Sequence, residues 1–466
     1  MRFSLSAFLL PTMIGSFATA QSTWIVDDTP GPGVHFTSLP AAVNAAASGD
    51  TLLIAPGNYQ PFHAMNKSLT ILGSGSLATI IDGPPIIGMI LDYLTITAPP
   101  AGATFRLSGV AIRQDLTTAS VSGSPIFSSR LAVMAAGPHG AVVLTDLTSE
   151  PATSSGTSGG IGLRVSGSTV HASRCAFRAG WYGQPGGQNH FGAAGVIVNG
   201  AGLFVADSCV ISGGSPVVPL GLPQILFATG GHALAVTDSA AHLTRTDLTG
   251  GAAMAPAGWS STQGGAGLSA QGVASVRVYG SAANSIAGGA AGNAVNSFGG
   301  PGINAASAAT VASFGPIAVA GGAGLGLGTS GPATTGSGLI QLGLPPRPAL
   351  SLTGSAPSGG DLDATLPVTL GIAAPALGPQ LFVLFVDLDP GYFALPGLSA
   401  EPFLLTGSAA LLLVGLLDAA GQFAVSFVPA AQTPEWTNLP LHLQAFAFDP
   451  AAGAWLGSNA EIRRMR

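Results

Sequence analysis

The chain has 466 residues, a formal net charge of −6, and charged side chains at only 7% of its positions. It carries no basic stripe, which argues against nucleic acid as a partner. Because 47% of its residues are apolar, the 68 glycines do not indicate a disordered chain. We expect a folded, β-rich protein with an uncharged Ser/Thr/Gly/Asn surface.

The first twenty residues have the pattern of a secretory signal peptide. Arg2 is followed by an apolar core from Phe3 to Phe17 and by the small-residue sequence Ala18-Thr19-Ala20. The only other strongly apolar run, Ala409 to Leu417, is about half a membrane span. We therefore expect cleavage near Ala20, no membrane span in the mature chain, and a protein that is secreted or held at the cell envelope.

The segment from Phe36 to Tyr59, FTSLPAAVNAAASGDTLLIAPGNY, predicts a short helix, a turn and a buried strand. Ser38 can cap the helix, and Pro40 suits its first turn. Leu39, Ala42, Val43 and Ala46 recur at helical spacing and form one apolar face. Gly49 ends the helix, and Leu52 to Ile54 form the strand.

This segment closely resembles the start of pectin-lyase-like right-handed parallel β-helix proteins. The resemblance implies that the helix caps the open end of a solenoid and that the strand begins its first coil. We therefore expect residues 21–66 to form the cap and first strand, and residues 67–344 to form the parallel β-helix. Further short strands are expected at Lys67–Leu72 and Thr79–Asp82.

An internal repeat supports a solenoid. Similar segments of two or three short alternating strands, each ending near a glycine pair, start about 35 residues apart: Gly162–Gly180, Val196–Gly214, His232–Gly251, Gly267–Gly289 and Gly302–Gly322. Aligning Cys175, Cys209 and Thr246 stacks small or apolar residues between coils, so these columns are predicted to point inward. Gly/Pro-rich segments between the repeats are predicted to be loops that can form a binding face.

Charged residues are expected beside these columns on the outer face. Asp207 is predicted to lie diagonally between Arg174 and Arg245. We interpret this set as a solvated ion-pair ladder rather than as a catalytic pair, because charge pairs at protein surfaces are usually structural.

Cys175 and Cys209 are the only cysteines, and they share one column of adjacent coils. Neighbouring parallel strands are about 4.8 Å apart, which is within reach of a disulfide, and export favours oxidation. Two stacked, reduced core thiols are the other interpretation, since the stacking geometry does not obviously suit the disulfide torsion.

Residues 345–466 change character and are predicted to form a small β-sandwich. Alternating strands are expected at Ala364–Ile372, Leu381–Asp387, Ala410–Leu417, Phe423–Val428 and Leu441–Phe448. A β-helix followed by such a domain is similar to secreted proteins of planctomycete-type bacteria.

The pectin-lyase-like resemblance also implies chemistry that we looked for in the sequence. Lyases of this fold generally use Ca²⁺ held by clustered carboxylates and an Arg or Lys base, and the galacturonan hydrolases use clustered aspartates. The acids between Lys67 and Leu344 are Asp82, Asp92, Asp115, Asp146, Glu150, Asp207, Asp238 and Asp247. No two are adjacent or separated by one residue, so no catalytic residues are assigned.

No cofactor or metal site is predicted. Asp27-Asp28 can be a Ca²⁺ loop, but we interpret it as an Asx-type turn, and we treat Asp387 and Asp389 in the same way. The eight histidines lack zinc-site spacing.

Loop aromatics are the candidate binding residues: Trp181, Tyr182, His190, Phe191 and Trp259. Flat rings suit sugar faces, although such rings can also plug loops against the solenoid. We therefore expect an exported scaffold or surface-interaction protein that binds polysaccharide through these rings. The alternative is a polysaccharide lyase or glycoside hydrolase acting on polyuronate-type glycans.

Overall fold

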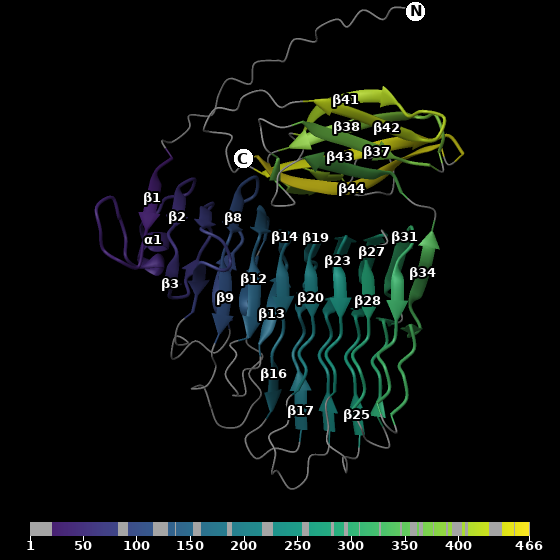
Figure 1. The fold of residues 1–466 in the computed structure, drawn as a ribbon, viewed down its shortest axis with the longest axis horizontal. Coiled ribbons are helices and arrows are strands. Elements are labelled where there is room, and N and C mark those ends of the chain that lie inside the picture. The colour runs from purple at the N-terminus through teal and green to yellow at the C-terminus, as the bar shows by residue number, and fades with distance from the viewer. Residues whose placement is uncertain are drawn as a thin grey trace, which may run out of the picture.

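The computed structural model describes residues 21–465 apart from a set of short segments. The segments outside the description are 83–91, 115–128, 136, 152–159, 184–188, 217–226, 254–260, 281–283, 293–296, 307, 326–327, 345–346, 355–360, 363–366, 376, 388–389, 394–402, 406–408, 428–439 and 452. The protein is a right-handed parallel β-helix, with one short capping helix and a domain of small β-sheets after it (Figure 1), which confirms the predicted fold class.

Three parallel sheets form the walls of the solenoid. Sheet A contains β1 (Thr23–Val26), β2 (Thr51–Ile54), β5 (Thr70–Gly73), β8 (Thr104–Ser108), β11 (Ala141–Thr145), β14 (Thr169–Ser173), β19 (Leu203–Asp207), β23 (Ala240–Thr244), β27 (Ser275–Tyr279), β31 (Thr310–Phe314) and β34 (Leu339–Leu344). Sheet B contains β3 (Gly57–Tyr59), β6 (Thr79–Ile81), β9 (Ala111–Gln114), β12 (Thr148–Pro151), β15 (Ala176–Arg178), β20 (Val210–Ser212), β24 (Asp247–Thr249), β28 (Ser285–Ala287) and β32 (Ala318–Ala320). Sheet C contains β4 (His63–Ala64), β7 (Asp92–Thr97), β10 (Ser129–Met134), β13 (Ile161–Ser166), β18 (Val196–Asn199), β22 (Leu234–Thr237), β26 (Leu268–Gln271), β30 (Ile303–Ala305) and β33 (Thr334–Thr335).

The stacking register agrees with the sequence alignment of the repeats. Ala172 pairs with Ala206, and Ala206 pairs with Leu243, along the interior of sheet A. Phe177 pairs with Ile211 in sheet B. All five side chains lie in the solenoid core, so the predicted inward columns are confirmed.

In four successive coils, the bend from sheet A to sheet B is made by one residue with positive φ. Asp146, Arg174, Ser208 and Arg245 have φ between 46° and 53°. The left-handed region is costly for residues with a Cβ. Its recurrence at one column shows that the stacked neighbours hold each corner in place.

The helix α1 (Leu39–Ala45) closes the N-terminal end, as predicted. Ser38 caps it through its hydroxyl, which accepts a hydrogen bond from the Ala41 N–H, and the helix buries Leu39 and Val43. The prediction that the first coil begins at Leu52–Ile54 is wrong. β1 precedes the helix and pairs in parallel with β2, because Asp50 accepts hydrogen bonds from the Ser22 N–H and the Trp24 indole and so ties this strand to the edge of sheet A.

The C-terminal domain has two main sheets around one apolar core. One contains β35 (Ala349–Gly354), β37 (Val368–Ala373) and β42 (Gln422–Phe427), and the other contains β36 (Asp361–Leu362), β44 (Ala454–Met465), β43 (Pro440–Asp449), β38 (Leu381–Asp387) and β41 (Ala410–Leu416). A hairpin of β39 (Pro390–Phe393) and β40 (Phe403–Leu405) accompanies them. The core contains Leu352, Ile372, Phe382, Leu384 and Leu443, among others.

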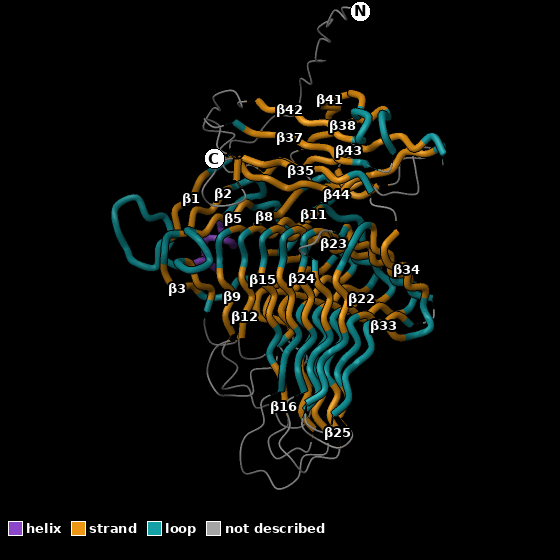
Figure 2. The backbone as a smooth tube through the Cα atoms, turned by 45° about the vertical axis from the view of Figure 1, so that its right-hand side comes forward, coloured by secondary structure: helices purple, strands orange, loops and turns teal. Residues whose placement is uncertain are grey.

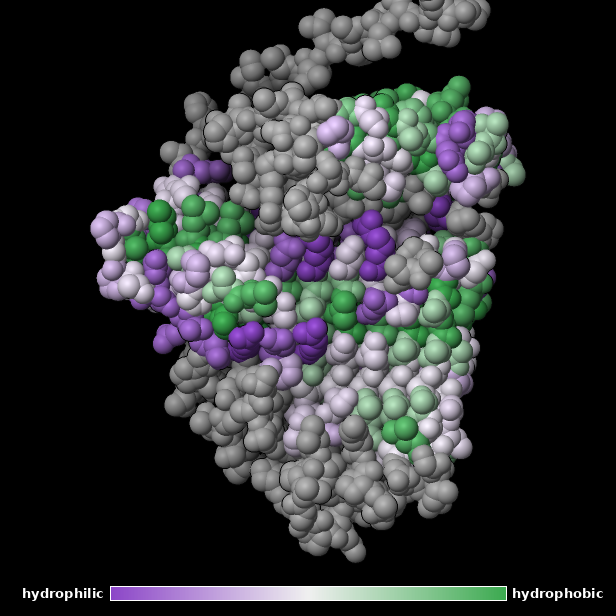
Figure 3. Space-filling model, in the orientation of Figure 1, coloured by the Kyte–Doolittle hydropathy of each residue, from purple (hydrophilic) through white to green (hydrophobic). Residues whose placement is uncertain are grey.

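The C-terminal domain lies on the outer face of sheet A (Figures 1 and 2). His442 of β43 contacts His171 of β14 edge to face, with 6.0 Å between ring centroids. Figure 3 shows hydrophilic residues gathered along the seam between this domain and the solenoid. Among the described residues, no helix is long and apolar enough to span a bilayer.

Candidate functional site

A glycine-built neck projects from one corner of the solenoid. After each late sheet B strand, the chain leaves through a glycine pair, forms one strand of a separate sheet, and returns through a second glycine pair to sheet C. We call this separate sheet the neck sheet, and it contains β16 (Trp181–Gly183), β17 (Asn189–Gly192), β21 (Phe227–Thr229), β25 (Ser261–Gln263) and β29 (Ser297–Phe298). Figure 2 shows the stacked neck segments between the solenoid and this sheet.

The glycine pairs hydrogen-bond in two directions. The first glycine of a pair donates to the next coil, as the Gly250 N–H does to the Ala287 carbonyl at 2.8 Å. We call the outgoing and returning segments of the neck its two arms. The second glycine of a pair donates across the neck to the opposite arm, as Gly251 does to Gly231 and Gly265 does to Gly251, both at 2.8 Å. A Cβ on Gly265 would overlap the Gly231 carbonyl. The arms can approach this closely only because their residues have no side chains.

The prediction that the Gly/Pro-rich segments are simple loops is therefore wrong in part. Residues 179–194 contain β16 and β17, and the later segments contain β21, β25 and β29. Glycine runs carry no alternation of side chains, so the pattern that predicts strands is missing where backbone pairing alone makes the structure.

A groove of about 540 Å³ lies in the angle between the neck sheet and sheet C. One wall is a column of paired neck-sheet residues, Phe191, Thr229, Gln263 and Phe298. These are spaced by the separation of parallel strands, about 4.8 Å. The opposite side carries the other polar and ring-bearing lining residues: His232, Pro301, Asn304, Pro332 and Thr335. The groove thus repeats along the stack with the period of the coils.

His232 presents a defined hydrogen-bonding pattern. Its Nδ1 accepts the Ala266 N–H at 3.0 Å, which leaves the hydrogen of the neutral ring on Nε2. Burial lowers the pKa of His232 below its usual value. The ring is therefore a neutral donor at neutral pH.

The groove combines ring faces with uncharged polar groups. Phe298 is 53% exposed, and Gln263, Asn304, Thr229 and Thr335 contribute amides and hydroxyls. None of the described residues that line it is charged. Apolar rings pack against the C–H faces of sugars, whereas amides and hydroxyls match sugar hydroxyls. The arrangement suits a neutral, polyhydroxylated chain.

The predicted aromatic residues are partly brought together here. Trp181 and Tyr182 of β16 pair with Gly192 and Phe191 of β17, and His190 pairs with Gly183. Trp181 is half-buried, and Phe191 lines the groove. The side chains of Tyr182 and His190, and all of Trp259, lie outside the described residues.

Sequence reasoning missed His232, Gln263, Phe298 and Asn304. A signal was present for two of them, because Gln263 and Phe298 stand immediately before a glycine pair, as Phe191 and Thr229 stand before the corresponding glycines. This position is on the outer face of the neck sheet in every coil from β17 to β29.

Cys175 and Cys209 are buried and hold free thiols in the structure. The Cys175 thiol donates to the Ser173 carbonyl at 3.3 Å, and the Cys209 thiol donates to the Asp207 carbonyl at 3.3 Å. Burial raises the pKa of the Cys209 thiol well above its ordinary value. The disulfide stays a prediction for the oxidised protein.

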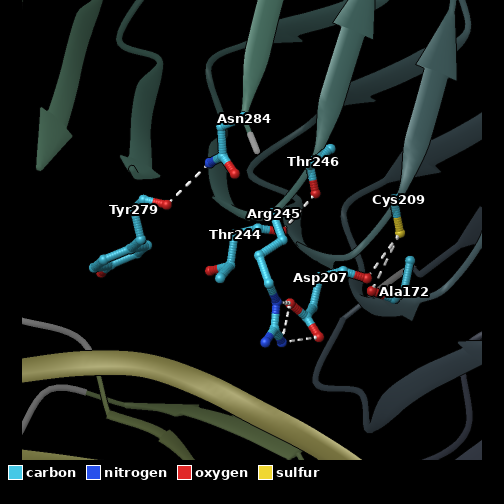
Figure 4. Close-up of polar contacts among 8 residues, drawn as sticks. All are labelled: Ala172, Asp207, Cys209, Thr244, Arg245, Thr246, Tyr279 and Asn284. Atoms are coloured by element: carbon cyan, nitrogen blue, oxygen red, sulfur yellow. Dashed lines mark hydrogen bonds and ion pairs between the residues drawn. The ribbon is translucent and has the colours of Figure 1, made fainter. Parts of the chain in front are cut away.

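The predicted ion pair between Asp207 and Arg245 is present, but the prediction that Asp207 is solvated is wrong. Asp207 pairs with Arg245, with oxygen–nitrogen distances of 2.6 to 2.9 Å, and its side chain is only 2% exposed (Figure 4). Arg174 pairs instead with Asp146, at 2.7 and 3.0 Å. In Figure 4 the Asp207–Arg245 pair points toward the ribbon of the C-terminal domain.

Other acids of the solenoid also have structural partners. Glu150 lies 2.9 Å from Arg113 and 3.3 Å from Arg178, and Asp92 lies 3.5 Å from Arg164. Within the described part of the chain, no three His, Cys, Asp or Glu side chains are grouped to hold a metal ion.

At the N-terminus, Asp27 accepts the Thr29 N–H at 2.9 Å, which is the predicted Asx turn. Asp28 accepts the Asn58 N–H, also at 2.9 Å. Asp387 ends β38, and Asp389 lies outside the described residues.

No protein-family model matches the chain. No curated protein matches it either. Two solved structures are similar in fold. Pectin methylesterase PemA from Erwinia chrysanthemi has 15% identity and a TM-score of 0.31, covering 56% of this chain and 80% of its own. A pectin methylesterase in complex with hexasaccharide VII has 14% identity and a TM-score of 0.34, covering 57% of this chain and 78% of its own.

Proposed function

We propose that this protein is an exported β-helix scaffold that binds a neutral polysaccharide in the groove beside the neck. The observation that carries the proposal is the groove's composition, with phenylalanine rings at both ends of a column that also contains Thr229 and Gln263. The signal-peptide pattern supports a bacterial extracellular or cell-envelope location, where such polymers are found.

The repeat of the groove supports a polymer rather than a small molecule as the ligand. Equivalent positions recur on four successive coils, so a chain can make the same kind of contact several times. Repeated weak contacts raise the overall affinity without a deep pocket. The neck would hold the neck sheet at the distance from sheet C that forms the groove.

The alternative of an enzyme acting on polyuronates has less support. Glu150, Asp92, Asp146 and Asp207 each face an arginine at salt-bridge distance. A glycosidase needs two carboxylates that face one glycosidic bond, and these four are each bound to an arginine instead. A groove for a polyuronate would also need cationic groups, which the described lining residues do not include.

Binding can be tested with neutral and uronate oligosaccharides on a glycan array, followed by calorimetry on the best ligand. We expect the full chain to bind a neutral glycan and Phe298→Ala to weaken binding about tenfold, the loss of roughly 1.4 kcal/mol that one ring contact contributes. Gln263→Ala should weaken it in the same direction. Trp181→Ala and Trp259→Ala test whether the aromatic hairpin and loop extend the site.

Val273→Ala is the matched control, since Val273 is 71% exposed and does not line the groove. Preference for uronates, or equal affinity of Phe298→Ala and Val273→Ala, would rule out the proposed site. Release of new reducing ends from a polyuronate would favour the enzyme instead.

A further inference from the structure

Three histidines are buried where the C-terminal domain covers sheet A. His171 and His442 are each 1% exposed, and His242 is 4% exposed. His171 and His242 are on the outer face of sheet A, at equivalent positions of β14 and β23, with Val205 of β19 between them. All three would meet water if the domain moved away.

The two histidines that contact each other across this interface have ring nitrogens without hydrogen-bond partners among the described residues. Neither ring nitrogen of His171 has a partner among the described residues, and Nε2 of His442 has none. A protonated imidazole must donate from both nitrogens. The site therefore accepts the neutral rings, whereas protonated rings would leave three donating nitrogens without an acceptor among the described residues, at a cost in free energy.

The surrounding charges also oppose protonation. Besides burial, the charges of His171 and Arg106 lower the pKa of His442. Burial and the charges of Arg277 and His171 likewise lower the pKa of His242. The Asp207–Arg245 pair lies on the same face of sheet A but is neutralised internally. Asp387 pairs with His442 in register on β38, and it is the carboxylate that the described C-terminal strands place beside that ring.

We propose that the C-terminal domain is an acid-releasable cover, and that protonation of His171, His242 and His442 detaches it from the outer face of sheet A. Release would uncover Val143, Val205 and Leu203, which are at most 5% exposed in the closed structure. The solenoid itself would stay folded, because its interior columns at these coils contain no group that becomes charged in acid. The proposal does not depend on glycan binding.

The change in stability of the closed state with pH follows from the burial of these three histidines. Burial lowers the pKa of His171 from 6.5 to about 3 and that of His242 to about 3, and it lowers the pKa of His442 well below its usual value. The closed state is therefore fully favoured above pH 6.5 and loses stability as the pH falls toward 3. At pH 5.0, His171 alone shifts the open-to-closed ratio about 30-fold, and His171 with His242 about 1,000-fold.

A cysteine reporter under the cover measures release directly. In a Cys175→Ala, Cys209→Ala background, Val205→Cys places a thiol beneath the domain, and Val276→Cys places one inside the solenoid. A disulfide reagent that reacts in acid is added between pH 7.5 and 4.5. We expect neither thiol to react at pH 7.5, and only the one at position 205 to react at pH 5.0. Protection of both thiols down to pH 4.5, or their simultaneous reaction, would overturn the proposal.

Histidine variants identify the titrating groups. His171→Leu with His442→Leu removes two protonation sites at similar volume, and we expect it to keep the thiol at position 205 protected at pH 5.0. His139→Gln, at a half-buried histidine of the loop before β11, should release like the parent. Release of the double leucine variant at the parent's pH would assign the effect to carboxylates and refute the role of histidine.

Discussion

Lys67 shows how a single charge is used in a chain that has few. It is the only lysine, and its Nζ donates to the carbonyls of Val43, Asn44 and Ala46 at 2.8 to 2.9 Å. These carbonyls belong to the last turn of α1, where helix groups lack internal partners and the helix dipole favours a cation. The ammonium thus connects the capping helix to the first coils.

Replacing this lysine should loosen the cap. We expect Lys67→Met to lower the free energy of unfolding by about 1.5–3 kcal/mol, the range for hydrogen bonds to charged groups. Denaturant unfolding followed by circular dichroism measures the change. Asn44→Ala removes an exposed side chain on the same turn and should cost well under that. Equal effects of the two substitutions would contradict the role of the ammonium.

Among single residues, sequence reasoning worked where the cause was local. Ser38 as a helix cap and Asp27 in an Asx turn depend on neighbours two or three positions away. The exposure of Asp207 was misjudged, because its burial and its pair with Arg245 depend on the stacking of coils 38 residues apart. Exposure of a charged residue is a property of the whole fold.

Among the elements, the neck has the strictest sequence requirement. Its arms approach through backbone alone, with the N–H groups of Gly251, Gly265 and Gly289 in one continuous hydrogen-bonded series. Buried backbone groups must be paired, and here the pairing needs no side chains. The two arms of the neck are therefore in direct backbone contact, and their hydrogen bonds hold the neck sheet in position beside the groove.

A methyl group in the neck should disrupt this packing. We expect Gly265→Ala to lower the melting temperature by several degrees, since the added Cβ overlaps the Gly231 carbonyl and the arms must separate. Differential scanning calorimetry provides the measurement. Gly31→Ala is the control, because its Cβ would meet only Val34, at 3.9 Å. A melting temperature of Gly265→Ala no lower than that of Gly31→Ala would show that the neck tolerates side chains.

At the scale of the whole molecule, the C-terminal domain and the solenoid share one buried face. β43 directs Leu443, Ala445 and Ala447 into its own domain's core, and it directs His442 toward sheet A. The domain therefore covers the side of the solenoid rather than its end. Apolar residues such as Val143 and Val205 occupy outer positions of sheet A because another domain lies over them.

Removing the domain should expose this face. We expect a chain ending at residue 344 to be less soluble than the intact protein and to bind a hydrophobic dye, as newly exposed apolar patches do. Val205→Asp should raise the solubility of the truncated chain but lower the melting temperature of the intact one. The test is that the same substitution improves the truncated chain and destabilises the intact one. An unchanged melting temperature of the intact chain with Val205→Asp would show that the C-terminal domain does not bury this face.

The sequence by itself determined the helix from its apolar face, the inward columns from the repeat, and the approximate strands of the C-terminal domain, such as Leu381–Asp387. These follow from apolar periodicity, which is a local pattern, whereas the solenoid and the capping role of the helix were implied by the resemblance to pectin-lyase-like proteins. Only the tertiary structure decided the neck, the groove at Phe191 and Phe298, and the burial of His171 under a distant domain. Glycine pairs carry no side-chain pattern, and the contacts between coils and domains join residues far apart in the chain, so neither could be read from neighbouring residues.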